Sequence, residues 1–112
     1  MARAWMPLYV GDYLRDTMHL STVQHGAYCL LLFYYWNTGG LPDDDRQLAR
    51  IAGMSVRQWR QHRPTLKTFF DDGWKHKRVE AELMRAEIVR VKRISSGQKG
   101  GIIASINRFK KR

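Results

Sequence analysis

The stretch "QHGAYCLLLFYYWN", residues 24–37, has almost no polar side, and it constrains the fold more than any other part of the chain. Ser21 and Gln24 have the spacing of a capping box, in which each side chain accepts the backbone N–H of the other, so a helix is expected to begin there. The glycines and proline of "NTGGLP" are expected to end this helix near Asn37. A helix that is apolar all round must be covered on both sides. The sequence therefore predicts a mainly helical domain packed around this segment.

Two further helices separated by a tight turn follow this segment. In "PDDDRQLARIAG", residues 42–53, the carboxylates of the first turn suit the positive end of a helix dipole. Gly53 can take the left-handed conformation that ends this helix, and Ser55 can cap the next one. The buried stripe of the first helix of the pair is expected to hold Leu48, Ile51 and Ala52. The order predicts a helix-turn-helix unit.

The helix that begins at Ser55 divides into two faces when each residue advances by about 100°. The residues expected on the buried face with Trp59 are Val56, Leu66 and Phe70. The residues expected on or beside the exposed face are Arg57, Gln58, Arg60, Gln61 and Thr68. Arg63 lies close to the apolar face, so it is expected to pair with a carboxylate of "DDD". Pro64 removes one backbone hydrogen bond, so it is expected to bend the helix.

Two segments have the composition of strands. "WMPLYVGDYL", residues 5–14, is aromatic and β-branched with a proline near its start, which suits a short edge strand or an extended arm. "WKHKRVEAE" alternates Trp74 and Val79 with basic residues, and suits one arm of a β-hairpin wing or a crossing strand. The predicted fold is therefore mainly α: a winged helix-turn-helix with a short β wing and an additional C-terminal helix.

The additional helix is expected from about Glu80, where Met84, Ile88 and Val91 have the spacing i, i+4, i+7. The glycines of "SSGQKGG" are expected to interrupt it. We expect residues 1–94 to form the winged-helix domain and residues 95–112 to form a basic, Gly-interrupted C-terminal tail. A homodimer could cover both this apolar stripe and the apolar helix of residues 24–37.

The charge of the chain favours a polyanionic partner. The formal net charge is +10. Residues 1–72 hold 8 basic and 7 acidic side chains, whereas residues 73–112 hold 12 and 3, so most of the excess lies in the second part. The terminal "NRFKKR" suits a phosphate-seeking tail or a poorly ordered end. The longest apolar run, residues 27–36, is about half the length of a bilayer span, so no membrane partner is expected.

Neither an enzyme nor a cofactor-binding protein is expected. "DDD" and "DD", at 43–45 and 71–72, could bind a divalent metal, but no His or Glu follows at a consistent spacing, so helix capping is preferred. The scattered histidines form no triad or zinc motif. They are His19, His25, His62 and His76. "GQKGG" lacks the ending of a phosphate-binding loop. The lone Cys29 excludes a disulfide within one chain and favours the cytoplasm, and the N-terminus does not resemble a signal peptide.

The strongest functional candidate is the helix after Ser55. Arginine can bind guanine bidentately and glutamine can bind adenine in the same way, and the second helix of a helix-turn-helix enters the major groove. Basic residues after the helix would follow the phosphate backbone. The predicted DNA-binding residues are Ser55, Arg57, Gln58, Arg60, Gln61, Lys67, Lys75, His76, Lys77, Arg78, Lys99, Arg108, Lys110 and Lys111.

Three alternatives to double-stranded DNA binding remain open. The basic residues could simply solvate an exposed helix face. The apolar helix surfaces could make the chain an adaptor that captures a host or replication protein. Single-strand or RNA binding would need exposed aromatic platforms, whereas most aromatic residues here have core spacing.

A set of short motifs resembles the YdaU-like family of phage and prophage proteins, a domain of unknown function. The matching residues are Pro7, Tyr9, Gly11, Asp12, Asp16, Thr17, Gly26, Ala27, Tyr28, Leu41, Pro42 and Asp44. The resemblance spans residues 5–101. Family members resemble the N-terminal winged-helix domains of phage replication initiators, which implies DNA binding at an origin or a regulatory site. Many such proteins carry a further domain, so the resemblance together with the length here implies a stand-alone DNA-binding protein.

Overall fold

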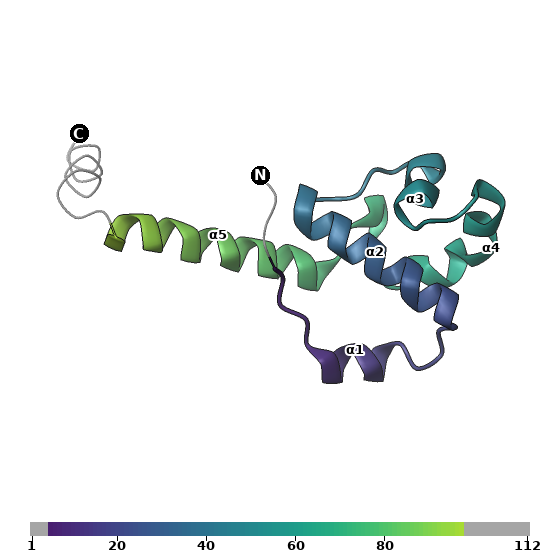
Figure 1. The fold of residues 1–112 in the computed structure, drawn as a ribbon, viewed down its shortest axis with the longest axis horizontal. Coiled ribbons are helices and arrows are strands. Elements are labelled where there is room, and N and C mark those ends of the chain that lie inside the picture. The colour runs from purple at the N-terminus through teal and green to yellow at the C-terminus, as the bar shows by residue number, and fades with distance from the viewer. Residues whose placement is uncertain (1–4, 98–112) are drawn as a thin grey trace. The chain divides into compact units, whose positions relative to one another are not determined.

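The computed structural model describes residues 5–97, and these residues contain helices and turns but no strand. The elements, in chain order, are α1 (Val10–Asp16), α2 (Thr22–Thr38), α3 (Asp45–Ile51), α4 (Val56–Lys67), the 3-10 turn η1 (Asp72–Trp74) and α5 (Lys77–Gly97) (Figure 1). The chain divides after Glu80 into two compact units. The first contains α1 to η1 and the first turn of α5, and the described part of the second is the rest of α5. The prediction of a mainly helical chain is confirmed.

Helix α2 begins and ends as its sequence predicts. The Ser21 side chain accepts the backbone N–H of Gln24 at 3.2 Å, and the Gln24 side chain accepts that of Ser21 at 3.0 Å. Gly39, at φ +92°, closes the last turn by donating its N–H to the carbonyl of Tyr35. The helix therefore ends at Thr38, one residue after the expected end.

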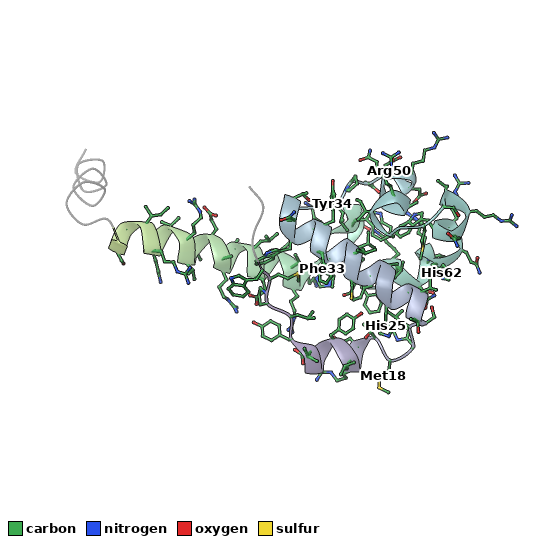
Figure 2. The ribbon with its side chains drawn as sticks, in the orientation of Figure 1. Met18, His25, Phe33, Tyr34, Arg50 and His62 are labelled. Atoms are coloured by element: carbon green, nitrogen blue, oxygen red, sulfur yellow. The ribbon has the colours of Figure 1, made fainter. Side chains whose placement is uncertain are left out.

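The predicted covering of α2 on both sides is wrong for the part of the chain that the structure describes. Its buried residues are Ala27, Tyr28, Leu31, Leu32, Tyr35 and Trp36. Helices α3 and α4 both contact α2, and Tyr13 of α1 stacks on Tyr28. Leu30, Phe33 and Tyr34 nevertheless stay exposed within residues 5–97. Figure 2 labels Phe33 and Tyr34. The helix is apolar all round, but the first unit covers it on part of its circumference.

Helices α3 and α4 form the predicted helix-turn-helix. The Asp44 side chain caps α3 by accepting the N–H of Gln47 at 3.0 Å. Gly53 has φ +70° and turns the chain, because this backbone conformation is open to glycine and unfavourable for most other residues. Ser55 caps α4 through a second capping box, with Gln58. Pro64 lies inside α4, which continues as a helix to Lys67.

The core of the first unit is aromatic. Trp59 is fully buried, and the centre of its ring lies 5.5 Å from the centre of the Trp74 ring. The centre of the Trp74 ring in turn lies 5.2 Å from that of Phe70. The predicted pairing of Arg63 is confirmed, since its Nε donates to Oδ1 of Asp45 at 2.9 Å. The same oxygen accepts the indole N–H of Trp59 at 2.9 Å. One carboxylate thus ties the start of α3 to two residues of α4.

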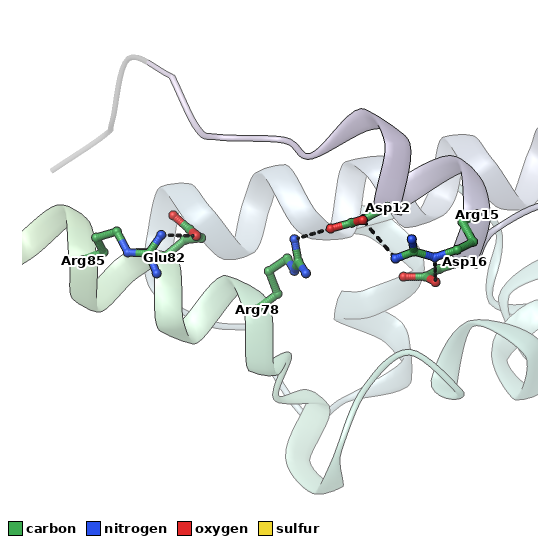
Figure 3. A network of polar contacts seen from close by, with 6 residues as sticks. All are labelled: Asp12, Arg15, Asp16, Arg78, Glu82 and Arg85. Atoms are coloured by element: carbon green, nitrogen blue, oxygen red, sulfur yellow. Dashed lines mark hydrogen bonds and ion pairs between the residues drawn. The ribbon is translucent and has the colours of Figure 1, made fainter.

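Residues 5–14 were expected to form an edge strand or an extended arm, and the strand is wrong: residues 5–9 have no regular secondary structure, and Val10–Asp16 form α1. Aromatic and β-branched composition indicated a strand, but contacts with distant residues override such local preferences. The Tyr13 hydroxyl lies 2.9 Å from Nδ1 of His25 on α2. Asp12 accepts from Arg15 at 2.9 Å and from Arg78 at 3.0 Å (Figure 3). These contacts fix a helical turn where the sequence indicated extended chain.

The β wing is also wrong, since residues 5–97 contain no strand pair. Between α4 and α5 the chain forms one isolated bridge, between Asp71 and Lys75. Gly73 and Trp74 both have positive φ, so the backbone reverses instead of extending. Helix α5 starts at Lys77, earlier than expected, because His76 caps it: the Nδ1 atom accepts the N–H of Val79 at 3.2 Å. The alternation of Trp74 and Val79 indicated a strand, although both are buried in a turn and a helix.

Helix α5 continues into "SSGQKGG", the segment that was expected to interrupt it. Ser95, Ser96 and Gly97 are helical. The remainder of "SSGQKGG" and the basic tail lie outside the described residues. The same applies to four of the predicted DNA-binding residues, Lys99, Arg108, Lys110 and Lys111.

Candidate nucleic-acid interface

Four exposed arginines surround the turn between α3 and α4. They are Arg46, Arg50, Arg57 and Arg60, and we call them the arginine surface. Within residues 5–97 their side chains form no hydrogen bond and no ion pair. Arg46 and Arg50 are one helical turn apart, so they project from the same face of α3. Figure 2 labels Arg50 on this helix. Guanidinium groups without a hydrogen bond of their own could bind anionic groups such as phosphates, or base edges.

Three members of the arginine surface line an open depression. Arg46 and Arg50 contribute from α3, and Arg60 contributes from α4. The other lining residues are Ala49, Met54, Ser55 and Val56. The depression therefore combines small and apolar side chains with cationic ones.

The nearby carboxylates do not neutralise the arginine surface. Asp45 is engaged by Trp59 and Arg63, and its pKa lies below the ordinary value because the indole N–H, then the Arg63 guanidinium and last the charge of Arg60 stabilise the carboxylate. Asp44 serves as the cap of α3. Asp43 remains exposed at the start of α3. Positive charge therefore predominates over the α3–α4 turn.

The two glutamines of α4 have different situations. Gln61 is exposed and forms no hydrogen bond within residues 5–97, so it is free to read a base edge. Gln58 already accepts the N–H of Ser55 at 3.0 Å, and the Ser55 hydroxyl accepts the N–H of Gln58 at 3.1 Å. The structure thus uses Ser55 and Gln58, both predicted DNA-binding residues, to start the helix.

Lys67 and His76 also have partners within the first unit. Lys67 Nζ donates to the carbonyl of Asp71 at 3.0 Å and lies 4.5 Å from the centre of the Trp74 ring. His76 Nε2 lies 2.9 Å from the hydroxyl of Tyr28. Because Nδ1 accepts a backbone N–H, the ring proton belongs on Nε2. Burial, and secondarily the charge of Arg78, lowers the pKa of His76, so the neutral ring is favoured.

The remaining predicted phosphate contacts lie around the start of α5. Lys75 and Lys77 are exposed and form no side-chain hydrogen bond or ion pair within the described part of the chain. Arg78 instead pairs with Asp12 (Figure 3). Its guanidinium also lies 4.7 Å from the centre of the Tyr9 ring. Arg78 therefore joins α5 to α1 and is less available to a ligand than the two lysines.

Arg46 and Arg50 were missed by the sequence analysis. The sequence "DRQLAR" does indicate a basic face, because its two arginines occur at i and i+4 of the predicted helix. The apolar stripe of the same helix indicated only which residues belong to the core. The sequence pattern within α3 does not reveal that Arg60 of α4 lines the same depression as Arg46 and Arg50. That arrangement depends on the angle at which the turn at Gly53 sets α4 against α3.

Comparison with known proteins identifies relatives but no established activity. A family model described as "Protein of unknown function (DUF1376)" matches residues 4–84. The chain is 42% identical over 100 residues to "Uncharacterized protein YdaU" of Escherichia coli (strain K12). That alignment covers 87% of this chain and 35% of the relative, so the chain spans about a third of that protein's length. No solved structure matches. None of the helices within residues 5–97 is long and apolar enough to cross a membrane.

Proposed function

Because the chain belongs to the DUF1376 family, a family of unknown function, we propose from its own surface that it binds double-stranded DNA through α3 and α4. The observation that carries the proposal is the arginine surface, four exposed guanidinium groups that form no hydrogen bond and no ion pair within residues 5–97. Arg57 and Arg60, near the start of α4, would reach base edges in the major groove, together with Gln61. Arg46 and Arg50 of α3 would contact the phosphates.

Contacts with DNA phosphates elsewhere on the chain would add affinity without adding sequence specificity. Lys75 and Lys77 are exposed cations that could bind phosphates, and the strong basic excess of residues 73–112 acts in the same direction. The resemblance to phage and prophage proteins supports a role in replication initiation or transcriptional regulation. The single cysteine supports action in the cytoplasm.

The proposal is tested by titrating duplex fragments with the protein at several salt concentrations. We expect log affinity to fall steeply with log salt, because bound phosphates release counterions. Replacing Arg57→Ala and Arg60→Ala together should lower the preference for the selected sequence by tenfold or more, since one bidentate base contact contributes about 1–3 kcal/mol of discrimination. The preferred DNA sequence itself would come from selecting the genomic fragments that the protein binds.

The matched control removes the same charge from other surfaces. Arg15 and Arg85 are exposed, and each pairs with an acidic residue of its own helix. The double variant Arg15→Ala, Arg85→Ala should retain the sequence preference. If the Arg57, Arg60 variant discriminates between sequences as well as this control does, the assignment of α4 to the groove is wrong.

A second candidate is an adaptor that captures a host or replication protein. The observation that favours it is the exposed part of α2, where Leu30, Phe33 and Tyr34 form an apolar surface. Affinity capture from nuclease-treated lysate separates the two functions. A stoichiometric protein that remains after nuclease treatment, and is lost with Leu30→Ser and Phe33→Ser, would favour the adaptor over the DNA-binding protein.

A further inference from the structure

Helix α5 carries an apolar stripe that is exposed in the second unit. The described part of this unit is one helix, from Ala81 to Gly97. Met84, Ile88 and Val91 have exposed fractions of 68%, 50% and 50%. Most of the stability of a helix in a protein comes from the packing of its apolar face, so an exposed apolar stripe along α5 calls for a partner.

The stripe has the spacing of a coiled coil over two heptads. If Ile88 is at position a, then Ala81 is also at a, and Met84 and Val91 are at d. Met84, Ile88 and Val91 thus fall on the seam that a second helix would cover, whereas the other exposed apolar residues of α5, Val89 and Ile94, fall at b and g. A β-branched residue at a, as at Ile88, favours two strands.

The flanking charges specify the orientation of the second helix. In this register Glu80 and Glu87 are at g, and Arg85 and Lys92 are at e. In a parallel pair, g of one helix faces the following e of the other, which brings Glu87 opposite Lys92 of a second copy. In an antiparallel pair, g faces g and e faces e, so like charges would meet. We propose that α5 pairs in parallel and in register with α5 of a second copy of this chain.

The contacts already present on α5 show which charge pair carries the proposal. Glu80 accepts a hydrogen bond from Tyr35, so its pairing with Arg85 is secondary. Both Glu87 oxygens accept from Arg90 of the same helix, with Nη2 donating to Oε1 at 2.6 Å and Nε to each oxygen at 3.2 Å, so Lys92 of a second copy would share this carboxylate with Arg90. Lys92 forms no side-chain hydrogen bond or ion pair within residues 5–97. The pair of Glu87 with Lys92 is therefore the one to test.

Sedimentation of the whole chain over a range of concentrations tests the pairing. We expect a reversible dimer that Ile88→Asp converts to a monomer without loss of the first unit's fold by circular dichroism. Glu87→Lys should weaken the dimer by about tenfold, because both symmetric pairs become repulsive. Adding Lys92→Glu should restore the affinity. Arg93→Glu, at the outer position f, is the matched control and should leave the dimer unchanged.

A disulfide tests the orientation. With Cys29→Ser as background, Val91→Cys places one thiol in each copy at the same level of a parallel pair. Oxidation should then give a covalent dimer, whereas an antiparallel pair would hold the two residues too far apart for a disulfide. A chain that stays monomeric at every concentration, a charge swap that does not restore the dimer, or a failure of the disulfide to form would each overturn the proposal. The pairing of α5 does not depend on DNA binding by α3 and α4.

Discussion

Asp45 offers the sharpest test of how α3 and α4 are held together. Its Oδ1 atom accepts two hydrogen bonds, from the indole N–H of Trp59 and from Nε of Arg63, both at 2.9 Å. Trp59 is 0% exposed, so its N–H loses its acceptor when Asp45 is replaced by alanine. We therefore expect Asp45→Ala to destabilise the first unit without changing its helices elsewhere.

The expected loss can be estimated from the two contacts. A buried donor left without an acceptor costs about 1–3 kcal/mol. The ion pair adds about 0.2–1 kcal/mol, because both side chains are 39% exposed and water screens the attraction. Asp45→Ala should therefore lower the free energy of unfolding by about 2 kcal/mol, or the melting temperature by about 10 °C for a domain of this size. Asp45→Asn keeps an acceptor for Trp59 and should cost about half as much.

Urea unfolding followed by circular dichroism measures these differences, and Asp43→Ala is the control, because Asp43 is an exposed carboxylate at the start of the same helix. The pKa of Asp45 is lowered mainly by the Trp59 hydrogen bond and secondarily by Arg63. The contribution of Asp45 to the free energy of unfolding is therefore present above its ordinary pKa of 3.8, and it is lost as the pH falls through the lowered pKa of the folded state. Asp45→Ala as stable as Asp43→Ala would refute the reasoning.

Three further substitutions test the turn and the start of α5. Ser55→Ala should lower the free energy of unfolding by about 1 kcal/mol, because α4 loses its cap; equal urea midpoints would contradict this. Gly53→Ala should cost about 1–2 kcal/mol, since alanine is strained at φ +70°, and a thermal melt would detect it. Burial and then Arg78 lower the pKa of His76, so the wild type should lose stability as pH falls below 6.5 through the lowered pKa, whereas His76→Gln should lose less between pH 7.5 and 5.5.

The sequence predicted those elements whose signals are local. Ser21 and Ser55, each followed three residues later by glutamine, mark the starts of α2 and α4, because a capping box depends only on one helical turn. Gly53 marks the turn for a similar reason. The pairing of Arg63 with a carboxylate of "DDD" followed from its position on the edge of the apolar face.

The errors arose where distant residues decide the conformation. Residues 5–14 have the composition of a strand, yet α1 forms because Tyr13 contacts α2 and Asp12 pairs with Arg78, which is 66 residues away. The proposed wing failed because His76, which was expected to bind phosphate, caps α5 and contacts Tyr28. Neither contact leaves a periodic signal in the neighbouring sequence. The same limit hid the approach of Arg46 and Arg50 to Arg60.

If α4 enters a DNA groove as proposed, the capping box at its start has a consequence for recognition. A base that recruits the Gln58 carboxamide must compete with the N–H of Ser55 for the same oxygen, so the gain at the base is offset by a loss in the helix. Gln58 would then discriminate weakly among bases, whereas Gln61 and the arginines bear no such cost. DNA sites that bind should accordingly vary most at the base nearest Gln58. The substitution Gln58→Glu keeps an acceptor for the N–H of Ser55, so it should preserve folding while its negative charge repels phosphate.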